Sequence, residues 1–329
     1  MTEIRFDILG IGNAMVDVVT RVEETFLSRH DMHKGAMILI DDKAAETLYA
    51  AMPPGTESSG GSAGNTCAVA AALGARVAYL GKVADDQLGE VFAHDMTAQG
   101  VHFPSPRATG GAPTARCLIL VTPDGQRTMN TFLGACVTFG EADVDEDLVA
   151  AAAVTYLEGY LFDPPAAQAA FRRAAAAAHR AGRQVALSLS DAFCVGRHRE
   201  AFRDLVANHV DILFANETEI TSLYEKNTFE EAAEAARADV ALAALTRSEA
   251  GSVILRGDET VTVAAAATKV VDTTGAGDAY AAGFLAGWTA GKPLATCGRM
   301  GSVAAAEVIS HYGARPEADL KALMANALG

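Results

Sequence analysis

The stretch DTTGAGDAYAAGF, residues 272–284, places two glycines and an aspartate at the start of an apolar segment. Glycine is entropically costly in regular structure, so the Gly-Ala-Gly run at 275–277 indicates that something must approach a bare backbone. Residues 270–272 (VVD) are expected to be extended, and residues 276–291 are expected to form a helix. Because the first N–H groups of a helix lack partners and its dipole is positive there, this turn predicts an anion site.

Asp278 follows this turn directly and therefore lies within one helical turn of the predicted anion. A carboxylate beside a bound anion is electrostatically unfavourable, which favours a chemical role for it. A general base that accepts a proton from a hydroxyl attacking a phosphoryl group would be such a role. The alternative is that Asp278 only interacts with the positive end of the helix dipole.

Composition excludes several classes of partner. The chain has 329 residues and a net charge of −15, which argues against nucleic acid and against an anionic membrane surface. Half of its residues are hydrophobic, as in a globular protein, and its five cysteines form no CxxC pair. No apolar run approaches the ~18 residues of a membrane span, and no signal peptide is visible. These features predict a cytoplasmic protein with buried structural thiols.

Working outward from residues 272–284, apolar strand-like runs alternate with alanine-rich helical segments. This alternation predicts an α/β fold with a doubly wound, mainly parallel sheet. The predicted strands are residues 6–12, 76–84, 153–159, 184–190 and 210–216, and the predicted helices between them include 62–75, 86–100 and 165–182.

Two regions interrupt the alternation. Residues 16–24 (VDVVTRVEE) and 35–41 (GAMILID) precede the first long helix, and residues 114–134 predict a hairpin with PDGQ as its turn. We expect a single domain over residues 1–329 that carries a small discontinuous β lid, formed by roughly 14–41 and 112–135. A lid of this kind would cover a ligand in the crevice of the larger sheet.

Two long segments resemble a known family. Residues 60–90 (GGSAGNTCAVAAALGARVAYLGKVADDQLGE) and residues 272–284 are similar to the two signature regions of the ribokinase-like (PfkB) sugar and nucleoside kinases. The opening GIGNAMVD (10–17), NETE (216–219) and the final helices extend the resemblance over nearly the whole chain. The resemblance implies a kinase that uses ATP and Mg²⁺, with K⁺ as a further cofactor in some relatives.

The resemblance also implies roles for the residues that match the phosphoryl-transfer motifs. Asp278 corresponds to the catalytic base, and Gly275, Ala276 and Gly277 correspond to the anion hole. Asn216 and Glu219 stand at the positions that organise the nucleotide phosphates and, through water, Mg²⁺. Asn216 could equally be a helix N-cap followed by acidic residues in the first turn.

Two further groups of positions complete the implied site. The acceptor side comprises Asn13, Asp17, Gly60, Gly61, Asn65 and Leu133. The ATP side comprises Asn216, Thr246, Ser248, Gly251 and Gly277, with Asp272 as a ligand of a monovalent cation. Ser248 stands where a glycine is common in the family, which is a departure from the pattern. The ordinary alternatives for Asp17 and Asn65 are a turn carboxylate and a polar residue at a helix start.

Within the family, three segments look most like the adenosine kinase branch, namely LGIGNAMVDVV (9–19), GAMILID and TMNTFLGA (128–135). This predicts phosphorylation of the 5′-hydroxyl of a purine ribonucleoside, with adenosine converted to AMP. A sugar kinase of the same family and a non-catalytic nucleotide or nucleoside sensor remain alternatives. The sequence predicts a monomer or a homodimer formed through the lid.

Other patterns are weaker. GGSAG (60–64) matches the serine hydrolase elbow, but the polar, proline-containing segment before it predicts no preceding strand. GIGNAM (10–15) begins like a dinucleotide fingerprint but has Met15 at the third glycine position. The sequence contains no G-x-x-x-x-G-K motif, and His30 with His33 lacks further metal-ligating neighbours.

Overall fold

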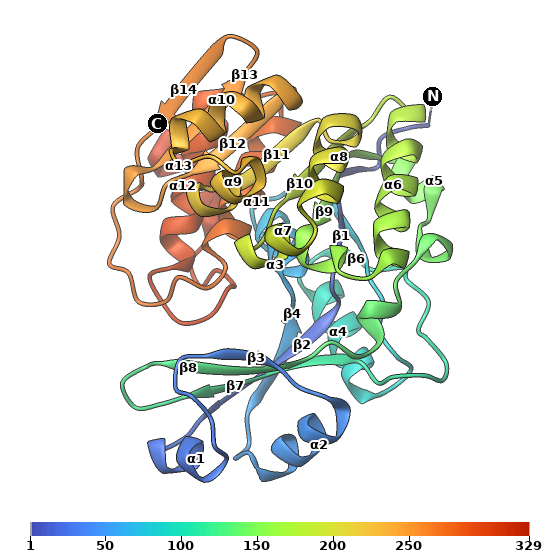
Figure 1. Cartoon of the computed structure of the whole chain (residues 1–329), viewed down its shortest axis with the longest axis vertical. Helices are drawn as coiled ribbons and strands as arrows, with labels where there is room; N and C mark the ends of the chain where they lie inside the picture. The colour runs from blue at the N-terminus through green and yellow to red at the C-terminus, as the bar shows by residue number, and fades with distance from the viewer. Residues whose placement is uncertain (1, 329) are drawn as a thin grey trace.

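The computed structural model describes residues 2–328 and contains two β-sheets of unequal size (Figure 1). The larger is nine-stranded in the order β14-β13-β12-β11-β10-β9-β1-β5-β6. Its strands pair in parallel from β12 to β6, and β13 and β14 are antiparallel. They are β1 (Phe6–Ile11), β5 (Val77–Leu80), β6 (Val101–His102), β9 (Ala152–Glu158), β10 (Gln184–Ser188), β11 (Ile212–Asn216), β12 (Leu242–Thr246), β13 (Ser252–Arg256) and β14 (Glu259–Val263).

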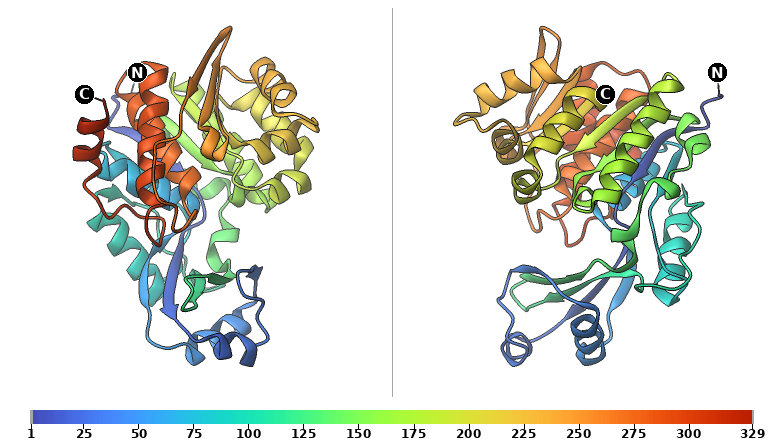
Figure 2. Two further views of the ribbon diagram at one scale, coloured as in Figure 1. Left: turned by 90° about the vertical axis from the view of Figure 1, so that its left-hand side faces the viewer. Right: turned by 45° about the vertical axis from the view of Figure 1, so that its right-hand side comes forward.

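Helices cover both faces of this sheet (Figure 2). One face carries α3 (Ser62–Ala72), α4 (Gln87–Ala98), α11 (Ala276–Thr289), α12 (Leu294–Val308) and α13 (Leu320–Leu328). The other carries α5 (Glu146–Ala150), α6 (Pro165–Arg180), α7 (Ala192–Arg197), α8 (Arg199–His209), α9 (Glu217–Tyr224) and α10 (Phe229–Asp239). Short 3₁₀ turns are η1 (Gly134–Thr138), η2 (Glu141–Asp143), η3 (Gly159–Phe162) and η4 (Ser248–Ala250).

Successive side chains of a β-strand point to opposite faces of the sheet, which explains why both faces need helices. In β1, Leu9 and Ile11 pack into the core on the α6 side, and Ile8 packs into the core on the α11 side. A strand with two apolar faces is stable only when each face is covered, which is the requirement that a doubly wound sheet satisfies. The predicted doubly wound, mainly parallel sheet is confirmed.

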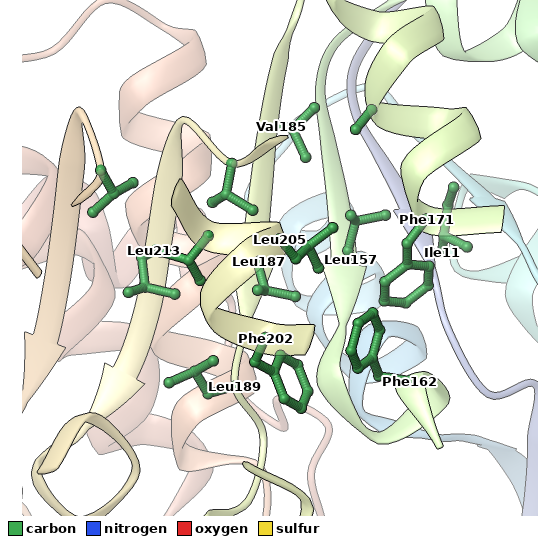
Figure 3. Packing of buried hydrophobic residues seen from close by; sticks show 14 of the residues in the cluster. Ile11, Leu157, Phe162, Phe171, Val185, Leu187, Leu189, Phe202, Leu205 and Leu213 are labelled. Atoms are coloured by element: carbon green, nitrogen blue, oxygen red, sulfur yellow. The ribbon is translucent and has the colours of Figure 1, made fainter. Parts of the chain in front are cut away.

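Three phenylalanine rings pack among aliphatic side chains in the core on the α6 side (Figure 3). The ring of Phe162 lies 4.4 Å from that of Phe202 and 5.7 Å from that of Phe171, measured between ring centroids. All three side chains are fully buried. This cluster ties α6 and α8 to the turn η3 that follows β9, so it supports one edge of the crevice above the sheet.

The smaller sheet, called the small sheet below, has the order β3-β8-β7-β2-β4. Its strands and flanking helices are β2 (Met15–Arg21), β3 (Met37–Leu39), β4 (Thr56–Gly60), β7 (Ala115–Val121), β8 (Arg127–Phe132), α1 (Glu24–Arg29) and α2 (Asp42–Ala51). The antiparallel pair β7–β8 is the hairpin that the sequence predicts. Strand β4 lies outside the two ranges expected for this sheet, and the prediction that no strand precedes GGSAG is wrong. The strand was missed because TESSG lacks apolar alternation and pairs through its backbone with β2.

One predicted element is absent. Residues 270–272 form no strand, and an irregular segment connects the end of β14 at Val263 to α11. The N–H groups of Val271 and Asp272 donate to the carbonyl of Ile309, at the end of α12, over 2.8 and 3.3 Å. The apolar pair Val270–Val271 is exposed rather than buried in the sheet.

All five cysteines are buried and unpaired, as predicted. Burial raises the pKa of the Cys67 thiol to about 12, so this side chain stays a neutral apolar group. Among residues 2–328, no helix has both the length and the apolar character that a bilayer crossing requires.

We expect Phe171→Ala to lower the free energy of unfolding by about 3–5 kcal/mol, because it removes a fully buried ring from a packed cluster. Urea unfolding monitored by circular dichroism measures this change. Phe193→Ala is the matched control, since the Phe193 side chain is 80% exposed, and its effect should stay within about 0.5 kcal/mol. Equal effects of the two variants would contradict the described core.

Candidate active site

A cleft of about 2570 Å³ separates the small sheet from the α11 edge of the larger sheet. It exceeds the roughly 300–1,000 Å³ of an ordinary small-molecule pocket. The carboxyl ends of β10, β11 and β12, the start of α11 and one face of the small sheet all contribute to its lining. Doubly wound folds bind ligands at this edge of the sheet. The cleft therefore has room for two substrates side by side.

Asp278 lies at the first turn of α11 and faces the first turn of α3. Ser62 donates a hydrogen bond to its Oδ1 over 2.6 Å, and the amide of Asn65 donates to Oδ2 over 3.2 Å. Burial raises the pKa of the Asp278 carboxyl to about 6, against the lowering effect of these two hydrogen bonds. The carboxylate is therefore mostly ionised at neutral pH and more basic than an exposed aspartate.

The two glycines of the turn before Asp278 are glycines for different reasons. Gly275 has φ +76°, and a Cβ there would come within 2.6 Å of the Ala314 Cβ. A Cβ on Gly277 would meet nothing within 4 Å, and its φ lies outside the left-handed region. Packing therefore requires glycine at 275 but not at 277. The N–H of Ala276 donates to the Thr273 carbonyl over 3.2 Å. The open space above Gly277 is where an anion could reach the backbone at the start of α11.

Asp17 occupies the opposite wall of the cleft, on β2. Burial raises the pKa of its carboxyl to about 6, and the positive charges of Arg315 and Arg127 oppose that rise. Gly60 on the paired strand β4 leaves room for it, since a Cβ there would come within 2.5 Å of the Asp17 carboxyl. An ionised carboxylate in this position can accept hydrogen bonds from two neighbouring hydroxyls of a ligand.

Apolar side chains surround Asp17 on the cleft face of the small sheet. In β2, Val16 and Val18 are buried on the far face, and Val19 joins Asp17 on the cleft face. The other apolar residues of this sheet that line the cleft are Met15, Met37, Cys117, Ile119, Val121 and Met129. The result is one strand carboxylate, Asp17, within a largely apolar surface that also carries Arg127, which suits a ligand with a hydroxylated part and an apolar part.

Of the predicted acceptor-side residues, Asp17, Gly61 and Asn65 line the cleft; among the described residues, Asn13, Gly60 and Leu133 do not. Asn13 is buried behind the cleft, and its side-chain amide donates to Glu158 Oε1 over 2.7 Å. Leu133 follows the end of β8, where the chain turns away into η1. The structure therefore brings together three of these six positions at the cleft surface.

Glu158 was not predicted from the sequence as a site residue. It ends β9 and is fully buried, and its Oε2 accepts a hydrogen bond from the N–H of Ala63 over 2.7 Å. Burial raises the pKa of this carboxyl to about 7. Glu158 thus joins the turn after β1, which carries Asn13, to the start of α3, which carries both partners of Asp278.

On the nucleotide side, Asn216 and Glu219 form the capping box of α9. Asn216 Oδ1 accepts from the Glu219 N–H over 2.9 Å, and Glu219 Oε2 accepts from the Asn216 N–H over 2.9 Å. Burial raises the pKa of Glu219 to about 7. Each Glu219 oxygen accepts one hydrogen bond, since Oε1 binds the Asn216 amide over 2.7 Å. A lone pair on each oxygen remains for water, which fits a cation held through its hydration shell.

Thr246, Ser248 and Gly251 line the cleft where β12 ends and β13 begins. Ser248 adopts a left-handed backbone with φ +50°, a conformation that glycine takes without strain. Ser248 therefore keeps the left-handed backbone that a glycine would adopt at this position. For a residue with a side chain, this conformation costs about 1–2 kcal/mol.

Asp272 lies outside the cleft lining, and its carboxylate is already fully hydrogen-bonded within the described residues. Oδ1 accepts from the N–H and hydroxyl of Thr274, and Oδ2 accepts from the N–H of Gly313 and from Arg127. These four donors match the roughly four lone-pair sites of a carboxylate. A monovalent cation at Asp272 would have to displace Arg127, so the K⁺ expectation stays a prediction.

Two arginines of the cleft were also missed. Arg127 comes from β8 in the small sheet, and Arg315 comes from the segment after α12. The signal for Arg127 was its place after the PDGQ turn, which brings the end of the hairpin against the loop before α11. No local pattern marks Arg315, because it reaches the site only through the packing of the C-terminal segment.

The fold and the arrangement of the site, with a glycine turn at the start of α11, a basic carboxylate beside it and a second carboxylate across the cleft, are those expected of a kinase. Residues 36–320 match the "pfkB family carbohydrate kinase" profile. A probable sugar kinase from Rhizobium etli CFN 42 is 51% identical over 99% of both chains, with a TM-score of 0.90. The adenosine kinase from Sinorhizobium meliloti is 53% identical over 98% of this chain and 99% of its own, with a TM-score of 0.89. Adenosine kinase 1 from Arabidopsis thaliana is 28% identical over 93% of this chain and 94% of its own.

The chain belongs to the pfkB family of carbohydrate kinases. It is a phosphotransferase with an alcohol acceptor, and its substrate class is nucleosides or sugars. Family membership implies ATP as the phosphoryl donor, usually with Mg²⁺. Within residues 2–328, no cluster of three or more His, Cys, Asp or Glu side chains could hold a metal ion.

We expect Gly277→Val to abolish phosphoryl transfer while the protein stays folded, because the added side chain fills open space instead of clashing with protein atoms. Initial-rate assays and thermal melting measure the two effects. Gly275→Val is the comparison, since its positive φ and its contact with Ala314 predict a lower melting temperature as well. A folded Gly277→Val protein with normal turnover would contradict an anion site at this turn.

Proposed function

We propose that this kinase phosphorylates the 5′-hydroxyl of a purine ribonucleoside, with adenosine converted to AMP. The observation that carries the proposal is the apolar cleft face of the small sheet around Asp17. A pentose offers almost nothing to an apolar surface of this breadth, whereas a purine ring would bury it from water. The two similar proteins described as adenosine kinases support the same substrate.

The acceptor is proposed to lie between the two carboxylates. Asp17 accepts hydrogen bonds from the 2′- and 3′-hydroxyls of the ribose, and Asn65 donates to the same sugar. Gly61 lets the start of α3 approach the ring, because it has φ +84° and a Cβ there would come within 2.2 Å of the Asn13 carbonyl. Asn13 and Gly60 act from behind this surface, through Glu158 and through the space left for Asp17. Tyr160 is one of the aromatic residues that line the cleft and could stack on the purine ring.

The chemical step follows from the placement of Asp278. Its carboxylate takes the proton from the 5′-hydroxyl as that oxygen attacks the γ-phosphorus of ATP. The bond from the γ-phosphorus to the bridging β–γ oxygen breaks, and ADP leaves. The N–H groups of residues 275–277 stabilise the charge on the transferring phosphoryl group. Glu219 and Asn216 would orient the water shell of a bound Mg²⁺, which would neutralise the charge of the nucleotide phosphates. Thr246, Ser248 and Gly251 would contact the nucleotide.

The small sheet is proposed to act as a lid. The cleft is wider than its ligands need, so closure over the acceptor would exclude water from the reacting groups. The oligomeric state, a monomer or a homodimer formed through the small sheet, stays a prediction. The cytoplasmic location also stays a prediction.

A sugar kinase is the second candidate, and the similarity to the probable sugar kinase from Rhizobium etli supports it. The two candidates predict opposite orders of acceptor activity, because a pocket that closes over a sugar leaves no room for a purine. A non-catalytic sensor, the third alternative, would not require a base at Asp278 and would show no turnover with any acceptor.

We expect Asp278→Asn to lower kcat by at least ~10²-fold with little change in KM, because a general base contributes typically ~10²–10⁴-fold to the rate. Coupled detection of ADP release measures kcat. Asp86→Asn is the control, since the Asp86 carboxylate accepts three hydrogen bonds from Gly89 and Thr114 outside the cleft. Near-normal kcat in Asp278→Asn would remove this residue from the catalytic role.

The acceptor is tested by kcat/KM for adenosine, 2′-deoxyadenosine, inosine, guanosine, ribose and fructose under one condition. We expect adenosine to be the best substrate. Losing a charge-assisted hydrogen bond costs roughly 1.5–3 kcal/mol, so 2′-deoxyadenosine should be about 10- to 150-fold poorer. Asp17→Ala should weaken adenosine binding and reduce this discrimination. If ribose or fructose exceeds every nucleoside, the sugar kinase alternative replaces the present proposal.

A further inference from the structure

The carboxylates of the cleft create an electrostatic difficulty. Asp278 feels the negative charges of Asp17, Glu158 and Glu219, and each of these carboxyls has a pKa raised by burial. A base that must stay ionised near other carboxylates, and next to the phosphates of ATP, needs a compensating cation. The titratable and charged side chains facing Asp278 are Asp17 from β2, Tyr156 and Glu158 from β9, Tyr160 from η3, Glu219 from α9 and Arg315 from the C-terminal segment.

Arg315 is the cation in this set, and the protein backbone fixes its position. Its Nη1 donates to the carbonyl of Gly64 over 2.8 Å. Its Nη2 donates to the carbonyl of Ser59 over 2.7 Å and to the Ser59 hydroxyl over 3.0 Å. Ser59 is held in turn by Asp95, which accepts from its N–H and its hydroxyl. The guanidinium therefore spans the end of β4 and the first turn of α3.

The partners of Arg315 place its charge beside the base. Gly64 lies between Ser62 and Asn65, the two residues that donate to Asp278. The Arg315 side chain also lines the cleft. Its Nε is buried without a hydrogen-bond partner among residues 2–328.

We propose that Arg315 is a positioning residue that keeps Asp278 ionised and holds the start of α3, with Ser62 and Asn65, against that carboxylate. The inference rests on the proposed role of Asp278 as the base. The fixed guanidinium lowers the pKa of Asp278 and that of Asp17, against the rise that burial causes in both. Because the base must be deprotonated, the rate falls as pH decreases through the pKa of Asp278 at about 6. The acidic limb of the pH profile is the range in which the rate falls as the pH decreases. Removing the positive charge of Arg315 must therefore move this limb to higher pH.

The experiment is the pH profile of kcat/KM with the acceptor that the wild-type enzyme turns over fastest. We expect Arg315→Gln to shift the acidic limb upward by on the order of one pH unit. Arg315→Lys keeps the positive charge but loses the bidentate hydrogen bonding to the backbone. The acidic limb of this variant should therefore stay near that of the wild type. Arg199→Gln is the matched control, because Arg199 donates to the carbonyl of Ser222 and pairs with Glu225 outside the cleft. Its limb should not move.

An Arg315→Gln enzyme with the wild-type limb, whatever its melting temperature, would overturn the proposal. If Arg315→Gln does not fold, Arg315→Lys decides. A folded lysine variant with the wild-type limb supports the role of the charge, and an inactive one or one with a displaced limb contradicts it. The Asp278→Asn variant distinguishes failure of the proposed function from failure of this inference. An active Asp278→Asn enzyme would disprove the role of Asp278 as the base. An inactive Asp278→Asn enzyme, together with an Arg315→Gln enzyme whose acidic limb is unmoved, would disprove only the role of Arg315.

Discussion

The contact between the starts of α3 and α11 is the interaction on which the cleft depends. Asp278 accepts hydrogen bonds from Ser62 and Asn65, residues more than 200 positions away in the chain. Two helix N-termini meet there, and both bring unpaired N–H groups and positive dipole ends to the same place. A carboxylate at this junction is held by the protein and is available to a ligand, which is the combination that a catalytic base needs.

The larger sheet makes this contact possible because its central strands deliver their ends to one edge. Asn13 follows β1, Glu158 ends β9 and Asn216 ends β11, and all three lie at the carboxyl edge of the sheet. Glu158 connects two of these segments, because its buried carboxylate accepts hydrogen bonds from Asn13, after β1, and from the N–H of Ala63, at the start of α3. The small sheet then supplies the opposite wall, with Asp17 surrounded by apolar side chains.

The site predicted from the sequence and the site in the structure agree at the helix starts and differ at residues that reach the cleft from distant elements. Motifs located the residues at helix starts, since Asp278 and Asn216 both follow local signals that a short stretch of chain carries. Leu133 was expected at the acceptor but turns away with η1. Arg127 and Arg315 were missed; a local signal, the PDGQ turn, precedes Arg127, whereas Arg315 reaches the site only through packing that no local pattern encodes.

The alternation of strands and helices, the glycine turn before Asp278 and the family could be predicted from the sequence alone, because periodicity, glycine and helix-start signals act over a few residues. Only the tertiary structure decided what surrounds each carboxylate. The pKa of Asp278 depends on burial, on α3 and on Arg315, which lie far apart along the chain. The same holds for Asp272, which the sequence marked as a cation ligand and the fold pairs with Arg127. Electrostatic energies depend on distance in space and on exposure to solvent, and both are fixed only when the chain has folded.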